Sequence, residues 1–236
     1  MIERLSLPDV QALACDCLVR AGAPGPVAEA VAAEIAAAEA AGERRYGMSA
    51  LLRDIRLMRY GRIDAGAQAA IGRPRPGLMR CDAAHGFAAA ALARAVEALP
   101  QLAHRHGIAL LRLDRASDPG AMIRATSALA AQGLAALAFG AEGPGRVARP
   151  DSAAPARLRH PPRDALAMLL PPGPGGAPSD SPLDGPVAHG AWIIAVDAEA
   201  TGAPLAAAGV WEAAPAPPPA REIALSSELL EQIVTA

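Results

Sequence analysis

Near the N-terminus, three stretches repeat apolar residues at the three- and four-residue spacing of an amphipathic helix. The first follows Ser6-Leu7-Pro8-Asp9, whose residue types are typical of a helix N-terminus, and it ends at Gly22. The second ends at Gly42, and the third covers about residues 49–60, with its arginines opposite its apolar face. These segments predict a helical unit of three helices within residues 1–73.

After Pro74 and Pro76, which indicate a connector, the spacing of apolar residues changes repeatedly. Strand-like runs alternate with helix-like runs, and we expect Pro100 to kink or break the longer helix. This alternation is typical of an α/β layer. The expected strands are residues 77–82, 108–114 and 134–140, and the expected helices are residues 87–106 and 122–132.

Beyond residue 140 the chain is rich in Pro, Gly, Ala and Arg, and the patterns weaken. Residues 165–170 and 191–197 are typical of strands, while the proline-rich segment 171–189 between them predicts a loop or linker. We therefore expect an α/β domain over residues 74–212. A linker and a C-terminal helix that starts near Ser226 and returns to the helical unit would complete the chain over residues 213–236.

Composition narrows the function classes. The 236 residues are 52% apolar but only 3% aromatic, and 22 basic against 24 acidic residues give a net charge of −2. Nucleic-acid binding needs a concentrated basic face, so we expect no nucleic-acid partner. No uncharged apolar run reaches the length of a membrane span. All basic residues are arginine, which excludes a Schiff-base lysine and the lysine of a Walker A loop.

The sparse cysteines Cys15, Cys17 and Cys81 fit a reducing cytoplasm and buried, unpaired thiols. Cys15 and Cys17 lie two positions apart on a predicted helix, so they cannot share a metal. The five histidines show no metal-ligand spacing, and we expect no metal site. No secretory signal pattern precedes the first helix.

One glycine motif matches a dinucleotide-binding pattern in sequence but lacks the helix that the pattern requires. Gly143-Pro-Gly145-Arg-Val-Ala148 matches the dinucleotide pattern G-x-G-x-x-A after a predicted strand. A true fingerprint opens a helix that faces the pyrophosphate, but Pro150 and Pro155 follow here without helical spacing. We therefore do not expect a Rossmann turn.

Three other residues are candidates for the site: Ser117 and Asp118 as catalytic residues, and His85 as a substrate-binding residue. Ser117 and Asp118 lie in the loop after a buried strand, where α/β proteins tend to bind ligands. His85 lies at a helix start and is a candidate for lining a pocket. No G-x-S-x-G elbow or other hydrolase signature is present.

The order of several motifs resembles the malate/L-lactate dehydrogenase family of NAD(P)-dependent oxidoreductases. The matching stretches are "YGRID", "RCDAAHGF", "HRHGIALLRLDRASDPG", "HGAWIIAVDAEATG" and "REIALSSELLEQI". The resemblance implies an N-terminal helical unit, a nucleotide-binding α/β domain that is not a Rossmann fold, and usually a dimer. The fold we expect is therefore an α/β protein with a three-helix unit and a reduced, non-Rossmann α/β domain.

The departures from the family pattern fall on the chemistry-bearing positions. The family's catalytic His falls on Tyr46, and the Arg that pairs with the substrate carboxylate falls on Ala50. Arg44 and Arg45 replace the Asp and Ser before that His. In the second loop Ser117-Asp118 replace Asn-His, and only Gly120 remains as a weak cofactor-binding candidate. The chain is also shorter than full-length members and has no Lys for the family's Gly-His-Lys-Gly motif.

These losses favour a truncated, degenerate member without NAD(P)-dependent redox activity and without a cofactor. It would bind a small carboxylic acid or act in assembly, as a homodimer or as a hetero-oligomer with an intact paralogue.

Two enzymatic alternatives remain open. In the first, an active oxidoreductase uses NAD or NADP to reduce a 2-oxo acid or a cyclic imine acid. Tyr46 replaces the His as proton donor there, with Arg44 and Arg45 on the substrate, although an ordinary tyrosine has a pKa of about 10 and needs a depressing partner. In the second, an enzyme of another class uses Asp118 or His85 as base. A generic α/β binding domain would remain if the resemblance were mistaken.

Overall fold

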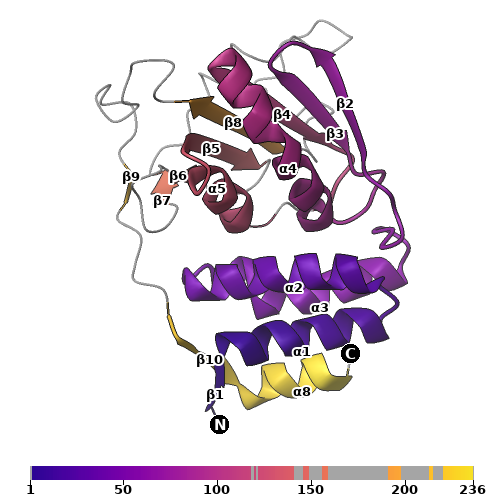
Figure 1. Cartoon of the computed structure of the whole chain (residues 1–236). Helices are drawn as coiled ribbons and strands as arrows, with labels where there is room; N and C mark the ends of the chain where they lie inside the picture. Colours follow the sequence, from indigo (N-terminus) through magenta and orange to yellow (C-terminus); the bar gives the residue numbers. More distant parts are fainter. Residues whose placement is uncertain are drawn as a thin grey trace, which may run out of the picture.

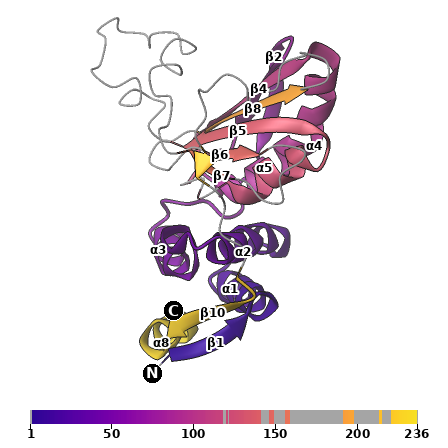
Figure 2. The same ribbon diagram turned by 90° about the vertical axis from the view of Figure 1, so that its left-hand side faces the viewer.

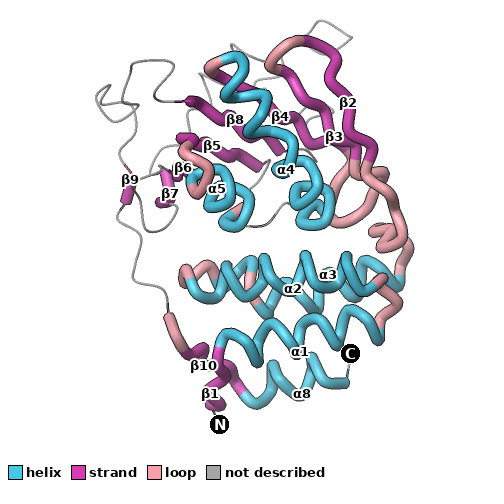
Figure 3. The backbone as a smooth tube through the Cα atoms, in the orientation of Figure 1, coloured by secondary structure: helices cyan, strands magenta, loops and turns pink. Residues whose placement is uncertain are grey.

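The chain folds into a helical unit stacked on an α/β domain, as the computed structural model shows (Figure 1). The structure describes residues 2–117, 120, 122–140, 146–148, 156–158, 191–197, 213–214 and 220–235. Helices make up nearly all of the lower layer in Figure 3, whereas the upper layer combines a sheet with helices. The predicted α/β class with an N-terminal three-helix unit is confirmed.

Three α-helices form the N-terminal unit, at the places that the apolar spacing predicts. They are α1 (Leu7–Arg20), α2 (Gly25–Ala40) and α3 (Met48–Arg59), with the short 3-10 helix η1 (Arg44–Tyr46) between the last two. Ser6 caps α1 by accepting a hydrogen bond from the backbone N–H of Asp9 at 3.3 Å. Gly22, Gly42 and Gly61 follow the helices in the left-handed conformation, which glycine adopts without steric cost.

The two ends of the described chain lie together beneath this unit (Figure 2). Strand β1 (Ile2–Ser6) pairs antiparallel with β10 (Glu222–Ser226), which leads into α8 (Ser227–Thr235). The predicted C-terminal helix is therefore present, and its buried Leu230 and Ile233 join the apolar core of the helical unit. The β1–β10 ribbon was not predicted, because its stability depends on a partner more than 200 residues away.

A mixed sheet forms the centre of the α/β domain, in the order β2-β3-β4-β8-β5-β6-β7-β9. Among the described strands, β3 and β4 are the one parallel pair, and every other neighbouring pair is antiparallel. The longer strands are β2 (Ala70–Arg75), β3 (Leu78–Asp82), β4 (Ile108–Asp114), β5 (Leu134–Gly140) and β8 (Ala191–Asp197), and the short ones are β6 (Arg146–Ala148), β7 (Ala156–Leu158) and β9 (Ala213–Ala214).

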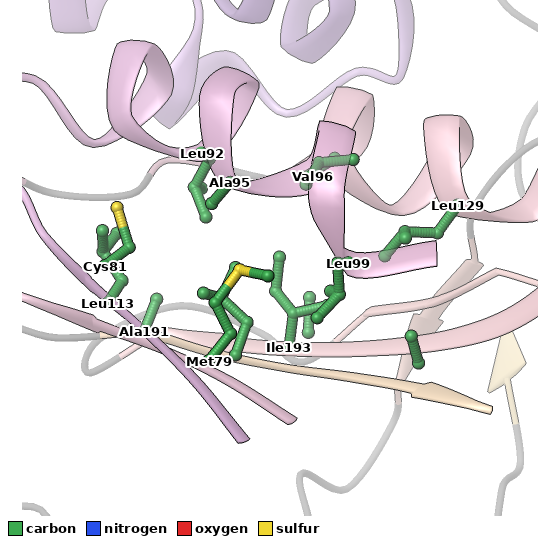
Figure 4. Packing of buried hydrophobic residues seen from close by; sticks show 14 of the residues in the cluster. Met79, Cys81, Leu92, Ala95, Val96, Leu99, Leu113, Leu129, Ala191 and Ile193 are labelled. Carbon is green, nitrogen blue, oxygen red and sulfur yellow. The ribbon is translucent and has the colours of Figure 1, made fainter. Parts of the chain in front are cut away.

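Two helices, α4 (Ala88–His106) and α5 (Ile123–Ala130), pack on one face of this sheet. Figure 4 shows Met79, Leu113 and Ile193 from the sheet pointing toward α4. Cys81 also lies in this core, where burial raises the pKa of its thiol to about 11. Cys17 is likewise buried, so the prediction of buried thiols is confirmed for Cys17 and Cys81, whereas Cys15 is only half-buried; none of the three forms a disulfide.

One expectation from proline positions was wrong, and of the kink or break expected at Pro100, the break was wrong. Residues 70–75 form strand β2 rather than a connector, because an edge strand can hold Pro74 where no ladder hydrogen bond is needed. The register of β2 shifts between Gly72 and Arg75, as a bulge would produce. Pro100 does not end α4, which continues to His106. The predictions for residues 165–170 and 171–189 fall outside the described residues.

Helix α2 joins the two layers because it packs on α1 and α3 on one side and on α4 and α5 on the other. None of the described helices is long and apolar enough to cross a membrane. Phe87, which follows β3, is buried in the apolar core of the helical unit. The Ile123 N–H, after β4, donates to Glu34 of α2, so the segments after both strands face the helical unit.

Candidate functional site

Two loops at the carboxyl ends of the parallel strands β3 and β4 form the centre of the candidate site. Hydrogen bonds hold these loops together: His85 N–H donates to the Arg115 carbonyl at 2.6 Å, and Ser117 N–H donates to the Gly86 carbonyl at 3.0 Å. The Ser117 hydroxyl accepts the Ala88 N–H at 3.0 Å and so caps the start of α4. Carboxyl ends of strands are where α/β sheets bind ligands, so this is a physically plausible position for a site.

The backbone of these loops is strained. Four non-glycine residues in the described chain have positive φ, namely Ala84, His85, Arg115 and Met122, with φ between 47° and 66°. The left-handed region costs an L-residue about 1–2 kcal/mol, and such strain gathers at functional sites. The fold therefore maintains a costly loop geometry at this edge of the sheet.

Tyr46 reaches this region from the helical unit. Its side chain is only 5% exposed and packs in a small apolar cluster with Ala38 of α2 and Ile123 of α5. The Arg45 guanidinium lies 5.6 Å from the centre of the Tyr46 ring. The structure thus brings Tyr46 to the start of α5, next to the second candidate loop.

The arginines beside Tyr46 have a different setting, because Arg44 and Arg45 are exposed. The Ser49 hydroxyl donates to the Arg44 carbonyl at 2.6 Å, which fixes the backbone of η1. Ala50, which the resemblance aligns with the family's carboxylate-binding arginine, is 5% exposed and has no polar side-chain group to offer a ligand.

Sequence reasoning missed two glutamates of α2 that set the geometry of the site. Glu39 accepts the Met48 N–H at 2.7 Å and so anchors the start of α3 directly after Tyr46 and Gly47. Glu34 accepts the N–H groups of Ile123 at 2.8 Å and Arg124 at 3.3 Å, at the start of α5. Carboxylates suit helix N-termini, where the helix dipole is positive. The available signal was three glutamates in an otherwise alanine-rich helix, of which these two are the ones that cap other helices.

The remaining predicted residues are more dispersed. His85 is exposed, and it lines neither of two cavities of about 270 and 310 Å³ that lie between α2 and α4. Gly120 is in the left-handed conformation, and a side chain there would approach Glu34 at 3.8 Å. Asp118 lies outside the described residues, so its role stays a prediction. No group of three metal-ligating side chains occurs among the residues that the structure describes.

The glycine motif at residues 143–148 does not open a helix. Residues 143–145 fall outside the description, but Arg146–Ala148 form β6, which pairs antiparallel with β5. A dinucleotide fingerprint requires a helix N-terminus at this point. The expectation that the motif is not a Rossmann turn is therefore confirmed.

An ion pair closes the carboxyl end of β3. Arg115 donates to both Asp82 oxygens, from Nε at 2.9 and 3.1 Å and from its terminal nitrogen at 2.6 Å. This hydrogen bonding lowers the pKa of the Asp82 carboxyl, outweighing the opposite effect of desolvation. The pair links the end of one strand to the loop after its neighbour.

Sequence comparison finds similarity to proteins named as dehydrogenases and reductases. The sequence model of the family described as malate/L-lactate dehydrogenase matches residues 5–157. The chain is 35% identical to a Delta(1)-pyrroline-2-carboxylate reductase of Ancylobacter novellus, over 58% of this chain and 40% of that protein. It is 32% identical to a (2R)-3-sulfolactate dehydrogenase (NADP(+)) of Chromohalobacter salexigens, over 59% of this chain and 41% of that protein. The matches thus span about two fifths of these curated relatives.

Solved structures share the fold at low sequence identity. A dehydrogenase from Sinorhizobium meliloti superposes with a TM-score of 0.72 at 16% identity, covering 100% of this chain and 99% of that one. A delta1-piperideine-2-carboxylate reductase from Pseudomonas syringae superposes with a TM-score of 0.64 at 20% identity, covering 84% and 82%. These similarities concern the fold alone.

Proposed function

Because the chain belongs to the malate/L-lactate dehydrogenase family, we propose that it keeps this family's scaffold without NAD(P)-dependent reduction of a 2-oxo acid. In this proposal it works as a binding or assembly protein, in the cytoplasm. Its ligand would be a small carboxylic acid. Its partner would be a second copy or an intact paralogue.

The observation that carries the proposal is the packing of Tyr46. Reducing a 2-oxo acid needs a proton donor beside the carbonyl oxygen and a cation that holds the carboxylate. At the position of the family's catalytic His, Tyr46 is 95% buried in the apolar cluster with Ala38 and Ile123. The position of the family's carboxylate-binding Arg holds Ala50. A ligand would have to displace packed side chains to reach the phenol.

The other candidate residues fit binding better than catalysis. Ser117 uses its hydroxyl to cap α4, so in this structure it has a structural task. Arg44 and Arg45 are exposed and adjacent, which suits the recognition of a carboxylate from solvent. Neither arginine lines either of the two cavities between α2 and α4.

Cofactor titration tests the proposal. Purified protein is titrated with NADH and with NADPH, and the heat of binding is followed by calorimetry. The expected result is no detectable heat of binding at cofactor concentrations up to about 1 mM. A Kd above that value corresponds to a binding free energy of less than about 4 kcal/mol. Stoichiometric binding in the micromolar range would contradict the proposal.

Assembly is tested separately by light scattering on the protein expressed alone. A polydisperse or aggregating sample that becomes uniform with an intact paralogue supports hetero-oligomerisation. A well-behaved homodimer supports the second-copy form of the proposal. A stable monomer, unchanged by the paralogue, contradicts the assembly role.

An active enzyme is the second candidate, and one contact favours it. The Arg45 guanidinium lies 5.6 Å from the centre of the Tyr46 ring, so a cation accompanies the phenol. In this alternative, Tyr46 donates the proton during reduction of a 2-oxo acid or a cyclic imine acid, with NAD or NADP as the hydride source. A Tyr46→Phe variant removes only the hydroxyl. Unchanged reductase activity with Δ1-pyrroline-2-carboxylate would exclude Tyr46 as the donor.

A further inference from the structure

A row of five residues crosses the sheet on the face opposite α4 and α5. The strand register places Gly72 of β2 opposite Arg80 of β3, and Arg80 beside Arg112 of β4. Arg112 lies opposite Trp192 of β8, and Trp192 lies opposite Phe139 of β5. Their strand neighbours Met79, Leu111 and Ile193 belong to the core under the helices, so the row faces the other way (Figure 4).

A single carboxylate fixes both arginines of the row. Asp114 accepts a hydrogen bond from Arg80 Nε at 2.5 Å and another from Arg112 Nε at 2.6 Å. The Asp114 side chain is only 10% exposed, whereas those of Arg80 and Arg112 are 58% and 31% exposed. Within the described part of the chain, these are the only hydrogen bonds of the two guanidiniums. Their terminal nitrogens remain available side by side.

The charge of this cluster is not balanced. Three guanidiniums, of Arg80, Arg112 and Arg115, accompany two carboxylates, of Asp82 and Asp114. The Arg115–Asp82 pair is internally satisfied, so Arg80 and Arg112 share one negative charge. Like charges directly opposite on neighbouring strands destabilise a sheet. Sheet stability therefore does not explain why two arginines stand next to each other here.

The residues on either side of the two arginines restrict the Arg112 side chain and leave space open beside Arg80. The Arg112 guanidinium lies 5.5 Å from the centre of the Trp192 ring, and this stacking restricts the arginine. Trp192 is 7% exposed, and its indole N–H has no acceptor among the described residues. A buried N–H without an acceptor costs free energy, and the packing of the sheet does not explain this cost. At the other end of the row, Gly72 has no heavy atom within 4 Å of where a Cβ would stand, so the space beside Arg80 is open.

We propose that Arg80 and Arg112 together bind an oxyanion, a phosphate or carboxylate group, on this face of the sheet. Two guanidiniums whose Nε atoms are tied to one carboxylate present their terminal nitrogens as a preorganised donor set. Arginine is suited to this task because its planar fork matches the geometry of such oxyanions. Arg80 and Arg112 lie on the strands β3 and β4 and not in the cluster around Tyr46, so the proposal does not depend on the proposed function.

Titration with inorganic phosphate tests the site directly. The readout is the emission of Trp192 in a Trp211→Phe background, where it is the remaining tryptophan. Ionic strength is held constant with sodium chloride, so that general screening does not contribute. The expected result is a saturable change in emission. Arg80→Gln should weaken the apparent affinity by about 10-fold or more, since a charge-assisted contact is lost.

The matched control is Arg105→Gln, because Arg105 is also exposed but lies at the end of α4, away from the row. It should leave the titration unchanged. Arg80→Gln is preferred to a change at Arg112 because Arg80 is the more exposed of the two, and circular dichroism verifies its fold. A response that does not saturate, or one that is equal in Arg80→Gln and Arg105→Gln, would overturn the proposal.

Two further probes identify the source of the oxyanion. Adenosine 2′,5′-bisphosphate tests for the phosphate of a nucleotide, and citrate tests for a free polycarboxylate. If one of these probes binds more tightly than inorganic phosphate, and if Arg80→Gln removes this binding, the site is assigned to that probe's chemical class. Binding of all three that is insensitive to Arg80→Gln contradicts the site.

Discussion

Gly47 directly follows Tyr46, and only a residue without a Cβ fits at this position beside Glu39. A Cβ on Gly47 would lie 2.1 Å from the Glu39 carboxylate oxygen, closer than any real contact allows. The same carboxylate accepts the Met48 N–H and holds the start of α3. Packing against Glu39 therefore requires a glycine at position 47, which the resemblance aligns with the Gly after the family's catalytic His.

Replacing Gly47 with Ala should destabilise the protein by about 1–3 kcal/mol, because the Glu39 carboxylate must move and its helix cap is weakened. Urea unfolding followed by circular dichroism measures this. Gly25→Ala is the control, since nothing lies within 4 Å of its Cβ position at the start of α2. Equal stability of the two variants would contradict the packing argument.

Asp82 and Arg115 give a pH-dependent prediction at the same scale. Hydrogen bonding from Arg115 lowers the pKa of Asp82 in the folded state, so the pair stabilises the fold above the carboxyl's unfolded pKa of about 4. That contribution is lost as the pH falls through the folded pKa. The melting temperatures of wild type and Arg115→Gln should therefore differ at neutral pH and converge in acid. Arg105→Gln should show no such convergence.

At the scale of elements, α2 organises both halves of the candidate site. Its Glu39 anchors α3 and its Glu34 anchors α5, so one helix positions both Tyr46 and the end of the loop after β4. The helix positions were predictable from apolar spacing, which is a local property. The two caps were not, because their partners are 9 and 89 residues away in sequence.

Removing the Glu34 cap should therefore loosen α5. Glu34→Ala is expected to cost about 1–2 kcal/mol, since two backbone N–H groups lose their acceptor at the positive end of the helix. Hydrogen exchange should be faster at the Ile123 and Arg124 amides in particular. Glu29→Ala is the control on an exposed position of the same helix, and faster exchange in both variants would argue against a local cap.

At the scale of the whole molecule, the two ends of the described chain close the helical unit. Strand β1 pairs with β10, and α8 inserts Leu230 and Ile233 into the core that α1, α2 and α3 share. The Cys17 thiol donates to the Ile233 carbonyl at 3.6 Å, a contact across 216 residues. The helical unit is thus completed by residues that follow the α/β domain in sequence.

Truncating Ile233 should accordingly affect the whole helical unit. Ile233→Ala is expected to destabilise the protein by about 2–5 kcal/mol, the range for deleting a fully buried branched side chain. Its neighbour Val234 is 52% exposed, so Val234→Ala should cost far less. Thermal unfolding compares the two, and similar losses would mean that α8 is not docked as described.

The sequence by itself determined the elements whose signal is local: the three N-terminal helices, α4 and α5, and strands β3, β4, β5 and β8. It also determined the family, because motif order survives where single residues change. The tertiary structure decided what depends on distant partners. Edge strand β2 and the β1–β10 ribbon lack a strong pattern of their own, and the burial of Tyr46 follows from the packing of three separate elements. The row of Arg80, Arg112 and Trp192 is likewise invisible along the chain, since only strand register makes these residues neighbours.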